Sequence, residues 1–383
     1  MSDLYAWLYE AGYWRTIPLP YCWKCGTRLD ENAQYCPVCG APLNKSPAAA
    51  SAQQARSSTG RYVEMRRGWS PLAIVGVVLI AVLAVALLAG ILIFAPVRSA
   101  SFGPEVKSAP RQGGVDSVNL VFNADIGRCN VTFGDLDGNA VVINVSASGS
   151  TGLLTPSQPL NFTLDYSRAG HVLYVNSSVR RTGVLWQPFM IGLNVVCDIM
   201  IDRGSNLSVD VSTSAGSIDF AAGQGVILDL LNLEAVTGSV DASLWSNVIV
   251  NGAVQAHSTT GSVDFSWTNL RVMNNLPLNV GTTTGSVNLD ITQDNVMGGE
   301  MTVDAGTVTG GVNLNLNISN GVGALINSST DIGSIKVNAT NFGGNKSPIQ
   351  SSNYPAQSNF AITLRTTTGG INIMAAYSTS IQS

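Results

Sequence analysis

The sequence STTGSVDF at residues 258–265 is one of seven related segments in the C-terminal half of this chain. The others are TSAGSIDF (213–220), AVTGSVDA (235–242), TTTGSVNL (282–289), TVTGGVNL (307–314), TDIGSIKV (330–337) and TTTGGINI (366–373). Their aligned glycines are separated by 22, 23, 24, 25, 23 and finally 36 residues. A fixed period of this size is typical of repeat architectures, in which each unit packs against its neighbours.

Each repeat has the alternation of a half-buried strand. In GSVDF, Val263 and Phe265 point to one side and Asp264 to the other, a period of two. Such a strand cannot bury its apolar face alone, whereas stacked copies about 4.8 Å apart bury a continuous apolar column. We therefore predict an all-β fold: a β-solenoid over 115–383 with regular repeats at 213–375. The units are expected to stack in chain order, with 341–359 as an interrupting loop.

The segment 115–207 has a less regular β pattern. DIGRCNVTF places Gly127 at the repeat glycine and Cys129 where an inward Val or Ile would stand. In VVCDIMI, Cys197 shares the parity of the apolar residues. Both cysteines are therefore expected to face inward. Whether they form a disulfide or remain two buried thiols stays open at this point.

From about 115 to 380 the chain resembles the family of prokaryotic surface proteins known as putative adhesins, through its repeated T-x-x-G-[SG]-[IV]-[DN] unit. The resemblance implies a cell-surface solenoid with a binding or adhesive role. It implies no catalytic chemistry.

The N-terminal segment YCWKCGTRLDENAQYCPVCGAPL contains two Cys-x-x-Cys-Gly motifs. Four thiolates from two such knuckles complete the tetrahedral shell of a structural zinc ion, with no open position for a substrate. Disulfides, a redox Cys-x-x-Cys and an iron–sulfur site are the alternatives. Residues 20–43 also resemble the short zinc-ribbon domains that begin many prokaryotic, particularly archaeal, membrane proteins. The predicted ligands of one zinc ion are Cys22, Cys25, Cys36 and Cys39.

Between these two parts lies a stretch from Trp69 to Ala95 that contains no charged residue. About 20 apolar residues span a bilayer, so 69–95 is expected to form a single transmembrane helix. Arg66 and Arg67 precede it, which favours a cytosolic N-terminus and an extracellular C-terminal domain. The remaining predicted segments are an aromatic-rich start at 1–19, a flexible linker at 44–67 and a juxtamembrane linker at 96–114.

Charge excludes several functions. Residues 101–383 carry eleven Lys and Arg against nineteen Asp and Glu, so nucleic acid is not expected as a partner. The same region has two histidines, in no recurrent charged cluster, and offers no nucleophile–base pair; we therefore expect no enzyme. Three outward aspartates are expected to stack on successive coils: Asp219, Asp241 and Asp264. They are expected to form a solvated polar face, and a calcium site is the alternative.

Together these features predict a membrane-anchored, non-enzymatic cell-surface protein that binds a glycan, an envelope component or another protein. The alternative is a transmembrane sensor or scaffold whose cytosolic zinc ribbon docks a protein partner. A glycan-active enzyme is a third and weaker interpretation.

Overall fold

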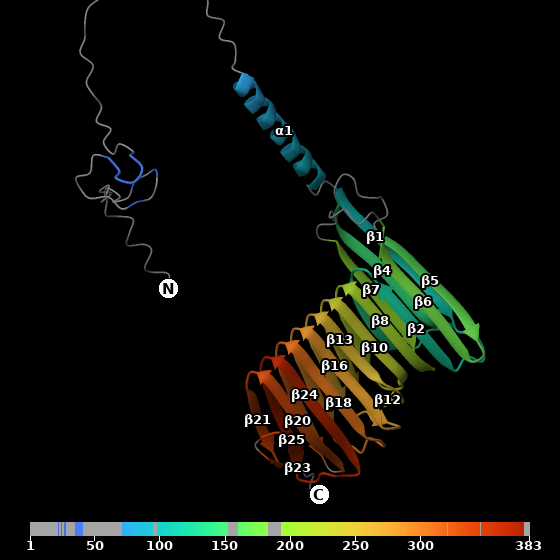
Figure 1. Ribbon diagram of the computed structural model, residues 1–383. Helices are drawn as coiled ribbons and strands as arrows, with labels where there is room; N and C mark the ends of the chain where they lie inside the picture. Colours follow the sequence, from blue (N-terminus) through green and yellow to red (C-terminus); the bar gives the residue numbers. More distant parts are fainter. Residues whose placement is uncertain are drawn as a thin grey trace, which may run out of the picture. The chain divides into compact units, whose positions relative to one another are not determined.

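The computed structural model describes residues 22, 24, 27, 35–40, 71–94, 98–151, 160–182, 193–319, 321–344 and 346–378. The chain divides into two compact units, Met1–Ser70 and Pro71–Ser383. The predicted segments 1–19 and 44–67 lie outside the described residues. The second unit begins with a helix, α1 (Pro71–Phe94), and continues with β-strands throughout (Figure 1). Among the described residues, no helix combines the length and apolarity needed to cross a membrane.

The strands form two sheets, which we name the first and second sheets. The first sheet has eleven strands, in the spatial order β1 (Arg98–Pro110), β4 (Asn139–Thr151), β7 (Asn194–Asp202), β3 (Arg128–Gly134), β9 (Ile218–Ala222), β11 (Val240–Trp245), β14 (Val263–Thr268), β17 (Val287–Gln293), β19 (Val312–Ser319), β25 (Ile371–Ser378) and β21 (Ile335–Thr340). From β7 to β21 all neighbours are parallel.

The second sheet has fourteen strands. Twelve follow the order β22 (Phe342–Gly343), β23 (Ile349–Ser351), β20 (Val322–Ile332), β24 (Ser358–Thr368), β18 (Met301–Thr309), β16 (Leu276–Thr284), β13 (Val254–Thr260), β10 (Ile227–Thr237), β8 (Asn206–Ala215), β2 (Ser117–Ala124), β6 (Val172–Arg181) and β5 (Leu160–Ala169). The short strands β12 (Ile249–Val250) and β15 (Arg271–Val272) pair beside β10. The prediction of an all-β fold is confirmed, with long, mostly parallel sheets.

Each repeat crosses from the second sheet to the first at its glycine. Gly261 joins β13 to β14 with a φ of +150°, and its N–H donates to the carbonyl oxygen of Thr284 in the next repeat at 2.9 Å. A Cβ atom at Gly261 would lie 2.1 Å from the carbonyl oxygen of Gly238. Both the backbone conformation and the contact between neighbouring corners therefore require glycine here.

The inner faces of the sheets form one continuous apolar core. Burial alternates along the strands as the sequence predicts: in β14, Val263, Phe265 and Trp267 are buried while the residues between them are partly exposed. Cys129 and Cys197 are both fully buried, which confirms that they face inward.

The repeats do not stack in chain order. The repeat formed by β24 and β25 lies between β18–β19 and β20–β21, so the last repeat in sequence is inserted before the one that precedes it. The 36-residue interval is therefore a return connection, in which β23 pairs antiparallel with β20 before the chain re-enters the sheet. A polar residue at an inward position gives a physical reason: Ser328 of β20 aligns with the buried Leu364 of β24, so this repeat is suited to the end of the stack.

The predicted linker at 96–114 also differs from the structure, because residues 98–110 form the edge strand β1, paired antiparallel with β4. Only Ala109 of this strand is buried among its described side chains. Its stability therefore comes from backbone pairing rather than from an apolar face, and no alternation in the sequence marks it.

Candidate metal centre and polar groove

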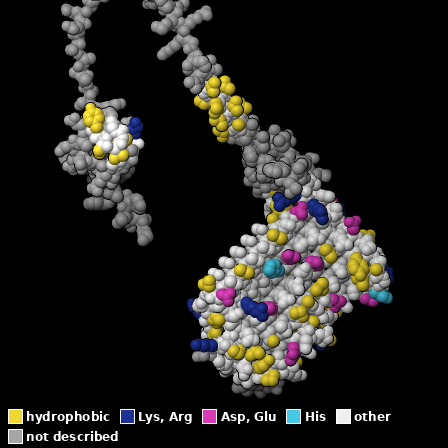
Figure 2. Space-filling model, viewed as in Figure 1, with side chains coloured by type: hydrophobic (Ala, Val, Ile, Leu, Met, Phe, Trp, Pro, Cys, Tyr) yellow, Lys and Arg dark blue, Asp and Glu magenta, His cyan; other side chains and the backbone are white. Residues whose placement is uncertain are grey.

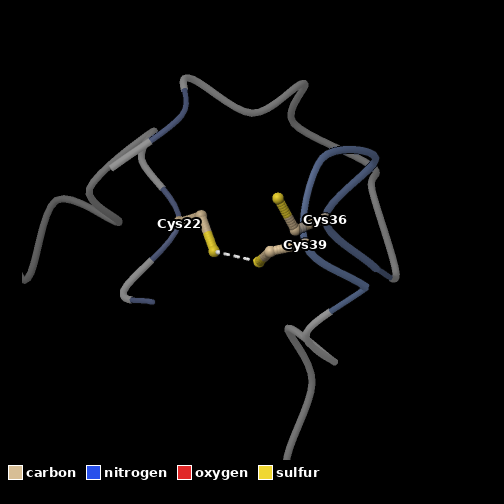
Figure 3. Close-up of side chains that lie close together, drawn as sticks. All are labelled: Cys22, Cys36 and Cys39. Carbon is tan, nitrogen blue, oxygen red and sulfur yellow. Dashed lines mark hydrogen bonds between the residues drawn. The ribbon is translucent and has the colours of Figure 1, made fainter. Parts of the chain in front are cut away.

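The N-terminal unit brings three of the four predicted zinc ligands together. Cys22 and Cys36 are buried and Cys39 is half-buried, and their three sulfur atoms all lie within 4.8 Å of one another (Figure 3). The Sγ atoms of Cys22 and Cys39 are 3.6 Å apart. The fourth predicted ligand, Cys25, lies outside the described residues.

Local turns orient these thiols. Cys36 and Cys39 flank a turn closed by Gly40, whose N–H donates to the Cys36 carbonyl oxygen at 2.9 Å and whose φ is +69°. The Cys22 N–H donates to the Thr27 carbonyl oxygen at 2.8 Å, a contact across the first motif. Glycine is suited to the position after the second cysteine because it adopts a positive φ without strain.

The sulfur geometry fits zinc. A tetrahedral site with Zn–S bonds of about 2.3 Å places its sulfur atoms about 3.8 Å apart, close to the distance between Cys22 and Cys39. Cys22, Cys36 and Cys39 are not joined in disulfides. A shell built from thiolates is closed to substrates, so the ion stabilises the fold of a segment too short to bury a core.

A second candidate site lies on the outer face of the first sheet. The residue after each inward Val or Ile of the repeat points outward, and the parallel register aligns these residues across the sheet. We name this row the polar ladder; it consists of Asp198, Asn130, Asp219, Asp241, Asp264, Asn288, Asn313, Asn372 and Lys336.

Hydrogen bonds connect the rungs of the ladder. Asn130 donates to Asp198 at 2.8 Å, Asn313 donates to Asn288 at 2.8 Å, and Asn288 donates to Asp264. These amide-to-oxygen contacts between neighbouring strands fix the side chains and reduce the repulsion of aligned acidic groups.

The three adjacent aspartates have different surroundings. Asp219 accepts two hydrogen bonds from the Arg128 guanidinium, which raises the pKa of Arg128. Asp264 is hydrogen-bonded by Asn288. The pKa of Asp241 is raised, first by partial loss of solvent and then by the negative charges of Asp219 and Asp264. Partners on the protein therefore already occupy oxygens of two of the three carboxylates considered for calcium.

Beside the ladder the surface is hollowed into a groove of about 260 Å³. Its lining comprises ladder residues, a second outward row two residues further along each strand, and the residues between the two rows. It consists of Asp241, Asp264, Phe265, Ser266, Asn288, Leu289, Asp290, Asn313, Leu314, Asn315 and Met374. In the second row, Asn315 donates to Asp290 at 3.1 Å. We name this hollow the polar groove.

Most of the surface of the polar groove is apolar, and among its polar side chains hydrogen-bond acceptors outnumber donors. Three carboxylates line it, at Asp241, Asp264 and Asp290, and none of the described residues that line it is Lys, Arg or His. The amides of Asn288, Asn313 and Asn315 each direct one N–H to a neighbouring side-chain oxygen. The groove therefore favours ligands that supply donors and disfavours anions.

Sequence reasoning predicted the stacked Asp219, Asp241 and Asp264 but missed Asn130, Asp198 and Arg128. It also missed the second row with Ser266, Asp290 and Asn315. The signal was present, because residues two positions apart in a strand share a face. The alternation along a strand does not show which hydrogen-bond or ion-pair partner each side chain has.

The family model of a zinc-ribbon domain matches residues 21–43. No curated protein matches the chain. Among solved structures, the chain is similar to a putative cell adhesion protein from Clostridium sporogenes, with 13% identity and a TM-score of 0.32, covering 73% of this chain and 100% of that one. A putative adhesin from Bacteroides fragilis is similar at 9% identity and a TM-score of 0.26, covering 72% of this chain and 98% of that one.

Proposed function

We propose that this chain is a single-pass membrane protein whose C-terminal β-solenoid lies outside the cell and binds neutral, polyhydroxylated ligands such as envelope glycans, without catalysing their reaction. The observation that carries the proposal is the acceptor-rich polar groove on the outer face of the first sheet. Sugar hydroxyls supply the hydrogen-bond donors that such a surface lacks, and a neutral sugar avoids repulsion by the three carboxylates.

The solenoid interpretation is supported by the connection between the sheets. Successive repeats contribute one strand to each sheet, and the corner glycines stack directly: the Gly285 N–H donates to Thr309 and the Gly310 N–H donates to Thr368, both at 2.9 Å. Buried hydroxyls add a second link, since Thr282 donates to the Gly261 carbonyl oxygen at 2.8 Å. Stacked coils of this kind present a long, rigid outer surface.

The membrane anchor is supported by the sequence of the stretch between Trp69 and Ala95, which is 27 residues long and free of charge. Within α1, the described side chains from Val75 to Leu88 are apolar and exposed, as the hydrophobic colouring of this helix in Figure 2 shows. An exposed apolar helix requires an apolar environment. Arg66 and Arg67 and the ribbon thiols favour a cytosolic N-terminus.

A binding role rather than a catalytic one is supported by the layout of the carboxylates. Cleavage of a glycosidic bond requires two carboxyl groups on either side of that bond. Asp241, Asp264 and Asp290 all project from one face of one sheet, beneath any ligand in the groove. This common direction favours holding a sugar from one side over cleaving it.

The ligand class is tested with the full chain in detergent on an array of immobilised oligosaccharides, both neutral and carrying carboxylate or sulfate groups. We expect neutral oligosaccharides to be retained and anionic ones to be excluded. The double variant Asp290→Ala and Asn315→Ala should weaken binding at least about tenfold, since lost hydrogen bonds to a charged group contribute roughly 1.5–3 kcal/mol.

Asp304→Ala is the matched control. Asp304 lies on the second sheet, whose face in Figure 2 carries scattered acidic, basic and apolar side chains, and this variant should leave binding unchanged. Binding that survives the groove variants, or that prefers anionic sugars, would refute the assignment of the polar groove.

Topology is tested separately by labelling intact cells with a membrane-impermeant reagent. A site in the return connection near Ser352 should be labelled and residues 1–67 protected. The reverse pattern would place the repeats in the cytosol and exclude an extracellular ligand.

A further inference from the structure

Two cysteines interrupt an otherwise β-branched column in the core. At the first inward position of each repeat, the parallel register of the first sheet aligns Cys197, Cys129, Ile218, Val240, Val263, Val287, Val312, Ile371 and Ile335. Seven of these nine positions hold Val or Ile, and the two cysteines occupy adjacent rungs on β7 and β3. Core packing alone does not require cysteine at these two positions, because Val fills the same position in four other repeats.

The geometry brings the two thiols together. Cys129 and Cys197 are direct register partners on neighbouring parallel strands, and both side chains are 0% exposed in the same core. Neighbouring strands lie about 4.8 Å apart, within the roughly 4.4–6.8 Å range of Cα separations that disulfides span. The Cβ atoms need to approach by only about 1 Å to reach the mean disulfide spacing of about 3.8 Å.

The protonation of the pair agrees with this contact. A hydrogen bond with the Cys197 thiol, followed by burial, raises the pKa of Cys129 well above its usual range. Two neutral thiols that face each other in a dry core are stable, but in that position neither can ionise and attack a soluble disulfide oxidant.

We propose that Cys129 and Cys197 form a disulfide bond that joins β3 to β7 before the core closes. Each thiol loses its proton and one electron, and an S–S bond forms between the two sulfurs. The two electrons and two protons pass to a disulfide oxidant of the oxidising compartment, which is reduced to two thiols. Once the sheet is complete, burial shields the bond from reductants.

The position of this bond suits a structural role. Sixty-eight positions separate the two cysteines in the sequence. Between them lie β4, which pairs antiparallel with β7, and β5 and β6, which pair antiparallel with each other; all three lie at the end of the sheets where the regular repeats are absent. A covalent link across this segment removes much of the freedom of the unfolded chain.

The same chain would then hold cysteines in two redox states. Zinc ligands must be reduced thiolates, whereas the β3–β7 pair would be oxidised. This requires two compartments, as the proposed topology provides, but it does not depend on the ligand of the polar groove. If Cys129 and Cys197 were free thiols, the glycan proposal would therefore still stand.

The test uses the full chain purified from membranes, denatured without reductant in the presence of N-ethylmaleimide and digested for mass spectrometry. We expect one linked peptide pair containing Cys129 and Cys197, free of the label. The ribbon cysteines of the same molecules should carry the label and serve as an internal control. Alkylation of both core cysteines, or a bond from either to another cysteine, would overturn the proposal.

Variants provide a second readout. Cys129→Val retains the side chain found in four other repeats, so it should fold, yet its thermal midpoint should fall by on the order of 10 °C because the cross-link is lost. The double variant with Cys197→Val should melt close to the single variant, since either change removes the whole bond. The neighbouring change Ile218→Val is the packing control and should shift the midpoint by only about 2–4 °C. An unchanged or higher midpoint for Cys129→Val would count against the bond.

Discussion

A buried glutamine provides the sharpest test of how the core is held together. Gln293, at the end of β17, is 0% exposed and makes four hydrogen bonds. Its Oε1 accepts from the Trp267 indole N–H at 3.0 Å and from the Leu270 N–H at 3.1 Å. Its Nε2 donates to the carbonyl oxygens of Leu270 at 3.2 Å and Asn295 at 2.6 Å. The substitution Gln293→Met keeps the length of the side chain and removes all four bonds.

The expected cost follows from the two donors left without acceptors. A buried unsatisfied N–H costs about 1–3 kcal/mol, so the indole and the Leu270 amide together account for roughly 2–6 kcal/mol. Trp267 is itself fully buried, so water does not reach its N–H without disturbing the core. For a domain of this size each kcal/mol lowers the melting midpoint by about 2–4 °C, which predicts a fall on the order of 10 °C.

The assay is a thermal melt of the full chain in detergent, followed by tryptophan fluorescence and circular dichroism. The matched control is Gln255→Met on the exposed face of β13, where a surface change should stay within about 0.5 kcal/mol. In a Trp267→Phe background one orphaned donor no longer exists, so Gln293→Met should cost about 1–3 kcal/mol less there. A loss below about 1 kcal/mol in the original background, or equal losses in both backgrounds, would refute the reasoning.

Three further predictions follow from the corner, the ladder and the metal centre. Gly261→Ala should lower the free energy of unfolding by more than about 3 kcal/mol and leave little folded chain, because the φ of Gly261 is +150° and a Cβ there would strike the Gly238 carbonyl. The control is Gly281→Ala, whose new Cβ meets mainly the His257 ring, at 3.3 Å; this variant should melt nearly as the original chain does. Asp241→Asn should raise the melting midpoint at neutral pH and change it little below about pH 3. The reason is that a carboxyl whose pKa is raised in the folded state makes the protein less stable as the pH rises from the unfolded pKa through the folded pKa. A variant that is less stable than the original chain at neutral pH would contradict this argument. Cys39→Ser should abolish the single equivalent of zinc found by metal analysis and unfold the ribbon, while the circular dichroism of the β-sheets stays unchanged; retained zinc would exclude Cys39 as a ligand.

Much of the fold was predictable because the repeat contains its own structural logic. Val263 and Phe265 alternate with Asp264, and this period predicts which side chains are buried before any pairing is known. The glycine before each strand predicts a corner, and Gly261 lies at one. For the metal centre, the doubled Cys-x-x-Cys-Gly predicts four ligands, and the structure brings Cys22, Cys36 and Cys39 together.

Other features could not be predicted from the sequence because they depend on partners that are distant along the chain. Nothing in RSASFGPEVKSAP, the strand β1, predicts a strand, since its order comes from pairing with β4. Gln293 shares the inward parity of Val287, Leu289 and Ile291 in VNLDITQ, but the alternation cannot show that its amide binds the Trp267 indole of the previous repeat.

The sequence by itself determined the strand period, the corner glycines, the inward parity of Cys129 and Cys197 and the zinc-ribbon cysteines, because each is set by residues within a few positions of one another. Only the tertiary structure decided that the last repeat inserts before its predecessor, that Arg128 pairs with Asp219, and that two outward rows enclose the polar groove. The physical reason is that a strand's alternation states which face is apolar, but not which strand will lie beside it. Neighbours in a parallel sheet are chosen by packing and hydrogen bonding between segments distant in the sequence.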